Sequence, residues 1–335
     1  MRICLIGAVA GATLALAAAA APAQHNAKSP PRFPSVSTEE AWNRLRGQNP
    51  PLPAWALALV KSLPRTTAAM LHLDYIHRAQ NPLGPVLAAK LHWTAADAIN
   101  CSYGKSYAEA DLRRAELDPK EFINSLGDAA KLPKDDRIVV DFARKMTNAA
   151  YTVTDAEVAL LLKRFGPEKV VAMVQTLAWA NFQNRIILGL GVQVEPNGPL
   201  PPLDPLLDKE GLTKLVAPKR PAWKEVQEGK ISVASLVRPD WQDQSGTESA
   251  KAMELQKSRQ PRIPLPDLGR FAAMPPDVRE QATKIVWSRV SMGYQPLLTQ
   301  TWFETMRTFQ KEAALNRVFS NSMFWVITRT NECFY

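Results

Sequence analysis

Helix-start signatures recur in the first half of the chain, and they constrain the fold more than any other feature. Residues 118–121 (Asp-Pro-Lys-Glu) combine a capping aspartate, a proline at the first helical position and a glutamate that can close a capping box. Residues 154–157 (Thr-Asp-Ala-Glu) form a second such box, and residues 166–168 (Gly-Pro-Glu) precede an apolar stripe at helical spacing. No convincing series of alternating strands appears. The sequence therefore predicts an all-α fold.

The helical pattern has a gap in its second half. It begins at Ser37-Thr38-Glu39-Glu40, fades between Gly191 and Pro264, where prolines and glycines recur, and resumes at Pro276. A length of 335 residues suggests two domains, at about 100–200 residues per domain. We expect a first domain over residues 37–195, a proline-rich linker over 196–263 and the N-terminal part of a second domain over 264–335.

The first residues read as a secretory signal peptide. Met1-Arg2 supplies a short positive region, and residues 3–20 are apolar or small without a charge. Ala21-Pro22-Ala23 then offers small side chains at the two positions that a signal peptidase reads, which predicts cleavage after Ala23. Later in the chain no run approaches 18 apolar residues, and a spanning helix needs about 20. We expect a soluble protein that is secreted or periplasmic.

Composition excludes little by itself. Apolar residues make up 46% of the chain and charged residues 22%, which is ordinary for a globular protein. The net charge of +9 is spread along the chain, and this favours solubility without indicating a nucleic-acid partner. No phosphate-binding loop, nucleophile elbow or dinucleotide fingerprint is present.

An internal repeat links the two helical parts. Residues 51–53 (Pro-Leu-Pro) lead to Trp93 and Cys101, and residues 264–266, with the same three residues, lead to Trp325 and Cys333. In both copies the tryptophan precedes the cysteine by eight positions, and a tyrosine follows the cysteine by two. This pattern indicates a duplicated domain. The second copy is longer, and its extra residues are expected around positions 292–316.

The cysteines allow two interpretations. Cys4 leaves with the signal peptide, so the exported chain keeps Cys101 and Cys333. An exported protein often uses cysteines in disulfides, and these two could pair. They could equally be two separate chemical sites, and the repeat favours the second interpretation.

Three further segments carry a family resemblance. Residues 138–145 (Ile-Val-Val-Asp-Phe-Ala-Arg-Lys), 153–155 (Val-Thr-Asp) and 178–185 (from Ala178 to Asn-Phe-Gln-Asn-Arg) follow one another in helical order after Cys101. Together they resemble the carboxymuconolactone decarboxylase and alkylhydroperoxidase-D-like family. The resemblance covers roughly residues 50–195, and a weaker one covers about 264–335.

The resemblance implies an all-α helical bundle, commonly oligomeric. We expect no cofactor and no metal. In the peroxidase members of the family, a Cys-x-x-Cys pair is followed four residues later by a histidine. One thiolate attacks the peroxide oxygen, and its partner resolves the sulfenic acid as a disulfide. The chain would then be an exported, homo-oligomeric peroxidase or thiol–disulfide oxidoreductase acting on a small peroxide with an unidentified reductant.

The first copy departs from the family pattern. Cys101 matches the leading cysteine, but Gly104 stands at the resolving position and Ala108 at that of the histidine. The upstream carboxylate of the family is also missing, since Ala89 and Leu91 occupy that region. Of the charged neighbours, Asp97 would raise the thiol pKa and Lys105 would lower it. A two-thiol cycle cannot run here, so Cys101 is either a buried structural residue or a reactive single thiol, and the first domain is expected to be a scaffold.

The second copy holds the favoured catalytic residue. Cys333 matches the leading cysteine, and the second redox residue of the motif would follow Tyr335, either as cysteine or as selenocysteine whose codon was read as a stop. A selenol is more acidic than a thiol and a better leaving group, which suits attack on peroxide. Truncation by a frameshift is the competing explanation. The alternatives to a peroxidase are a non-catalytic helical scaffold or binding protein, and decarboxylase-like chemistry on a small lactone.

Two other groups of residues were candidates for sites. His72, Asp74 and His77 lie close in sequence, but their spacing does not place all three on one helical face, so no metal site is predicted. The pairs Trp179 with Phe182, and Phe324 with Trp325, fit core packing or an oligomer face rather than a cofactor site.

Overall fold

The structure, a computed structural model, describes residues 33–45, 50–127, 131–204 and 260–331, with a few isolated residues between 247 and 254. Every regular element in these ranges is a helix, which confirms the all-α prediction. No helix in the described ranges has the length and apolar character to cross a membrane. The expected signal peptide over residues 1–23 and the candidate residue Cys333 both lie outside the described residues.

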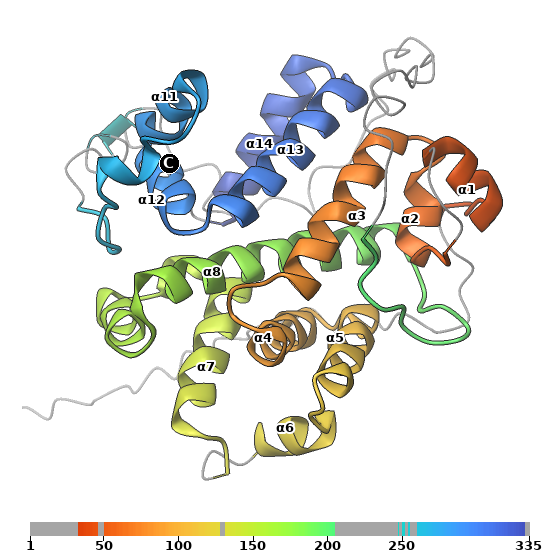
Figure 1. Ribbon diagram of the computed structural model, residues 1–335, viewed down its shortest axis with the longest axis horizontal. Helices are drawn as coiled ribbons and strands as arrows, with labels where there is room; N and C mark the ends of the chain where they lie inside the picture. The colour runs from red at the N-terminus through yellow and green to blue at the C-terminus, as the bar shows by residue number, and fades with distance from the viewer. Residues whose placement is uncertain are drawn as a thin grey trace, which may run out of the picture.

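The first part of the chain is built around α4. Its partners α5, α7 and α8 pack against it on different sides, and α3 precedes it (Figure 1). The bounds of the elements are α1 Thr38–Leu45, α2 Ala54–Leu59, α3 Pro64–Ala79, α4 Pro85–Ala98, α5 Ser102–Arg114, α6 Pro119–Ser125, α7 Lys134–Asn148, the 3-10 turn η1 Ala150–Thr152 and α8 Asp155–Leu190.

The helix starts lie where the sequence signatures predict them. The Asp118 side chain accepts a hydrogen bond from the backbone N–H of Lys120 at the start of α6. Thr154 and Glu157 form a reciprocal capping box at the start of α8. Within α8, Gly166 has φ 75° and ψ 164°, so the element consists of two helical segments that meet at residues 166–168.

The second part adds four helices and a 3-10 turn. They are η4 Leu268–Phe271, α11 Pro276–Lys284, α12 Val286–Tyr294, α13 Pro296–Ala313 and α14 Arg317–Thr330. The α13 helix lies along α3, and α12 packs against α8 and α13 (Figure 1). The second part therefore packs directly on the first.

The helix bounds of the two parts agree after one shift along the sequence. Pro296, the first residue of α13, lies 232 positions after Pro64, the first residue of α3, because 232 is the difference between 296 and 64. Adding the same 232 to the bounds of α4, Pro85–Ala98, gives those of α14, Arg317–Thr330. This shift also relates Cys101 to Cys333. By this shift the first residues of α3 and α4 match those of α13 and α14, whereas the sequence pattern predicts extra residues around positions 292–316.

Local geometry follows the same shift. The residue before α3, Leu63, has φ −138° and ψ 59°, and the residue before α13, Gln295, has φ −136° and ψ 67°. In the first turn of each helix a threonine hydroxyl donates to the carbonyl four residues earlier, Thr67 to Leu63 at 2.8 Å and Thr299 to Gln295 at 2.7 Å. The two helix starts thus share an uncommon backbone conformation as well as a proline.

The surroundings of α4 and α14 differ. Trp93 on α4 is 6% exposed and packs edge-on against Phe122, whereas its counterpart on α14, Trp325, is 53% exposed. The exposed large hydrophobic residues of α14 are Val318, Phe319, Met323, Phe324, Trp325, Val326 and Ile327. In the described part of the chain, α14 has no counterpart of the helices that cover α4.

Candidate functional site

Cys101 sits immediately before α5 and is closed off from solvent. Its side chain is fully buried, and its sulfur lies 3.9 Å from the backbone oxygen of Asn184 on α8. Burial raises the pKa of the Cys101 thiol, and the nearby backbone N–H groups and the charge of Lys105 offset only part of this effect. Because the thiolate is the reactive form, these surroundings favour the structural role among the two alternatives for Cys101.

The two charged residues expected to act on Cys101 form an ion pair with one another. The ammonium of Lys105 lies 3.1 Å from the carboxylate of Asp97, and both side chains are partly exposed. The charge of Lys105 still lowers the pKa of the Cys101 thiol, but by less than burial raises it. Desolvation remains as the main influence on Cys101.

Gly104, at the resolving position, has no room for a side chain. A Cβ atom added there would lie 2.1 Å from the side-chain oxygen of Asn184 and 2.9 Å from the Cβ of Ala96. The Asn184 amide thus fills the space that a second thiol would need. A side chain at position 104 would therefore require Asn184 to move.

Two buried histidines flank Trp179 next to this region. The ring of His77 on α3 stacks on Trp179 at a centroid distance of 4.9 Å, and His92 on α4 meets the same ring at 4.8 Å and an angle of 60°. Burial lowers the pKa of His77 to about 3 and that of His92 to about 4. Both imidazoles are therefore neutral near pH 7. Among the described residues, one ring nitrogen of His77 has no hydrogen-bond partner, and the Asn184 side chain is the polar group beside the ring of His92.

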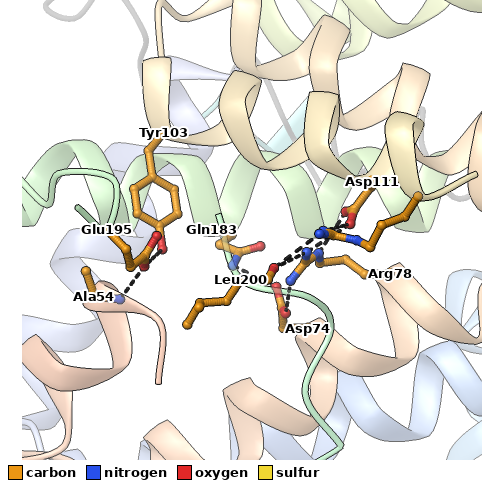
Figure 2. A network of polar contacts seen from close by, with 9 residues as sticks. Ala54, Asp74, Arg78, Tyr103, Asp111, Gln183, Glu195 and Leu200 are labelled. Atoms are coloured by element: carbon orange, nitrogen blue, oxygen red, sulfur yellow. Dashed lines mark hydrogen bonds and ion pairs between the residues drawn. The ribbon is translucent and has the colours of Figure 1, made fainter. Parts of the chain in front are cut away.

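A buried ion-pair network lies beside the histidines (Figure 2). The guanidinium of Arg78 contacts Asp74 at 3.1 Å and Asp111 at 2.8 Å, and it also donates to the carbonyl of Leu200 at 2.9 Å. Burial alone would raise the pKa of Asp111, but the charge of Arg78 outweighs it and holds this pKa below its usual value. The network is thus charged and internally satisfied, as a buried ion pair must be.

The segment after α8 covers this polar region. The carboxylate of Glu195 accepts hydrogen bonds from the hydroxyl of Tyr103 at 2.8 Å and from the backbone N–H of Ala54 at 2.7 Å (Figure 2). Leu200, further along the same segment, bonds to Arg78. Tyr103 in turn stacks on Tyr107 at 4.5 Å. Residues 191–204 therefore close one side of the region around Cys101.

The space left between these groups is small. His77, His92, Trp179, Arg78 and Asp111 line a cavity of about 10 Å³ together with Pro85, Ala88 and Ala89. That volume holds about one water molecule. The neutral imidazoles could accept a proton, but in this closed form no organic substrate can reach them.

The structure places some of the residues that the sequence singled out in this region and adds others that the sequence did not indicate. Trp179 is core, as expected, and Phe324 and Trp325 are exposed on α14, which agrees with the other expected role, an oligomer face, without testing it. Asp74 and His77 are buried and His72 is partly exposed, and no group of three metal-binding side chains occurs in the described ranges. His92, Arg78 and Asp111 were missed. A signal was available in the four-residue spacing of Asp74 and Arg78, which aligns an acid and a base on one helical face.

Comparison with family models, with curated proteins and with solved structures finds no match for this chain. Functional inference therefore rests on the residues and their geometry.

Proposed function

We propose that the chain is an exported thiol- or selenol-dependent peroxidase whose redox chemistry belongs to the second copy, with Cys333 as one member of the redox pair. The observation that carries this proposal is the shift of 232 positions, which relates helix bounds in the two parts and makes Cys333 the sequence counterpart of Cys101. The first copy acts as a structural support, packed through α3 on α13.

The closed environment of Cys101 supports this division of roles. Its raised thiol pKa and the filled space at Gly104 leave no redox pair in the first copy. In the proposed cycle one chalcogen of the second copy attacks the peroxide, releases an alcohol or water, and becomes a sulfenic or selenenic acid. The other member of the pair then displaces water to form a disulfide or selenenylsulfide bond, and a dithiol reductant restores both groups.

The test is peroxide consumption by the full-length gene product with a dithiol reductant. Cys333→Ala should abolish turnover, and the matched variant Cys101→Ala should keep it. The proposal is wrong if Cys101→Ala removes activity or if Cys333→Ala leaves it unchanged.

A non-catalytic helical scaffold is the second candidate. The observation in its favour is that the described polar cavity, at about 10 Å³, holds no more than a water molecule. A scaffold would show no turnover with any peroxide and reductant, before or after either cysteine substitution.

A further inference from the structure

A larger cavity lies in the second part of the chain, away from the histidines. It has a volume of about 580 Å³ and is formed by α11, α12 and α13. Its apolar wall includes Met274, Val278, Met292 and Phe303. Binding sites for small organic molecules usually measure about 300–1,000 Å³ and have mainly apolar walls. The cavity thus has the size and lining of a ligand site.

The corresponding face in the first part is filled. Gln300 and Phe303 line the cavity on α13, and the shift of 232 positions makes Ala68 and Leu71 their counterparts on α3. Ala68 and Leu71 are buried in a cluster that contains Trp42 and Trp55. In the first part, the cluster around Ala68 and Leu71 is thus filled by large side chains that include Trp42 and Trp55. In the second part, the space beside Gln300 and Phe303 is an open cavity.

One side of the cavity is cationic. Arg307 and Lys311 line it one helical turn apart on α13, and the guanidinium of Arg307 lies 5.8 Å from the ring centre of Phe303. Glu304 is the one acidic residue in the lining. The ammonium of Lys311 at this side of the cavity attracts an anionic ligand group.

We propose that this cavity binds a linear amphiphile with one anionic head group, such as a carboxylate or a phosphate monoester. The apolar tail would lie against the methionines and Phe303, and the head group would lie at Arg307 and Lys311. Methionine side chains adapt to flexible chains because they are unbranched and polarizable. The inference does not depend on the redox proposal, since it uses neither cysteine.

The test is calorimetric titration of the full chain with sodium dodecanoate below its micelle concentration. Dodecyl phosphate and dodecanol serve as parallel ligands. Thr308→Trp adds bulk to the cavity wall and should abolish binding. Lys311→Glu reverses a head-group charge and should weaken dodecanoate binding about tenfold or more, the equivalent of one charge-assisted hydrogen bond. The control Lys163→Glu makes the same charge change on the exposed surface of α8 and should leave binding unchanged.

The outcomes separate the possible occupants. Tighter binding of dodecanoate or of dodecyl phosphate than of dodecanol supports the proposal and identifies the head group. Equal binding of dodecanol, or equal loss in both lysine variants, overturns it. Absence of binding together with a concentration-dependent dimer that Thr308→Trp disrupts would show that a second copy occupies the cavity, which also overturns it. Circular dichroism of each variant confirms that the fold is kept.

Discussion

The carboxylate of Glu312, near the end of α13, accepts hydrogen bonds from Thr66 at the start of α3. The backbone N–H and the hydroxyl of Thr66 both lie 2.7 Å from the same Glu312 oxygen, and the other oxygen is 3.0 Å from the backbone N–H of Arg65. No side chain within α3 caps its first turn, since the preceding residue is Leu63. A residue 246 positions away thus supplies the cap.

Glu312→Gln should therefore destabilise the whole protein. The substitution keeps the size of the side chain but replaces one buried acceptor by a donor that faces backbone N–H groups, so we expect a loss of about 1–3 kcal/mol in the free energy of unfolding. Urea denaturation monitored by circular dichroism measures it. The control Glu280→Gln, on the exposed surface of α11, should change stability by less than about 0.5 kcal/mol. Equal midpoints for the two variants would contradict the capping role.

Gly104→Ala should be destabilising because its Cβ would overlap the Asn184 side chain. We expect a loss of about 1–3 kcal/mol, the usual cost of overpacking a core. Asn184→Ala removes the overlapping oxygen, so the double variant should lose less than the sum of the single losses, with a coupling energy of about 0.5–3 kcal/mol. Urea unfolding of the four proteins gives this coupling.

Gly189→Ala is the matched control for that cycle. Gly189 lies within a helix, as Gly104 does, but a Cβ added there meets nothing within 4 Å, so the same substitution should be neutral or stabilising by up to about 1 kcal/mol. If Gly104→Ala and Gly189→Ala behave alike, the close contact with Asn184 has no energetic consequence.

The buried histidines predict acid sensitivity with a defined sign. Their pKa values in the folded protein are lowered to about 3 for His77 and about 4 for His92, against 6.5 for a free histidine. Below pH 6.5 the unfolded chain binds protons that the folded chain does not, so stability is fully present above pH 6.5 and falls as the pH drops toward these lowered values. Each histidine should contribute a loss of about 1.4 kcal/mol per pH unit in that window.

His77→Phe and His92→Phe test this linkage. Each keeps a flat ring against Trp179 but cannot titrate. Each should therefore remove about half of the pH dependence that the two histidines give to the free energy of unfolding between about pH 6 and about pH 5. Urea denaturation at several pH values in that range provides the slopes. Unchanged slopes in both variants would mean that the histidines are not buried as neutral groups.

The thiol of Cys101 should be unreactive in the folded protein. In a chain that carries Cys4→Ala and Cys333→Ala, Cys101 is the single thiol, and a colorimetric disulfide reagent at neutral pH should modify it on the order of a hundredfold more slowly than in the denatured chain. The cause is its complete burial together with its raised pKa. Rapid modification without denaturant would indicate an open path to the sulfur.

Local signals in the sequence were sufficient for the helices. The capping box at Thr154 and Glu157 and the break at Gly166 depend on residues within one turn of each other, so a single sequence contains all the information that they need. The recurring tryptophan, cysteine and tyrosine were visible for the same reason, because their spacing is fixed. The shift of 232 positions appeared only when the bounds of α4 and α14 could be compared.

The contacts among the buried polar residues could not be predicted from local sequence signals. His92 contacts Trp179, which lies in a different helix far along the chain, and Arg78 pairs with Asp111 across two helices. These contacts depend on how α3, α4, α5 and α8 pack, and periodicity reports only that each helix has a buried face. Asn184 likewise fills the space at Gly104 through packing alone.

The outward-facing aromatic and aliphatic side chains of α14 affect how the protein behaves in solution. Phe324 at 67% exposure and Val318 at 73% belong to a row of apolar residues along a single helix, and rows of this kind favour self-association in water. Sulfate and phosphate salts strengthen the burial of apolar groups, so precipitation should set in at lower salt than for a chain without this row. Dilute, low-sulfate buffers are therefore the conditions under which individual molecules can be studied.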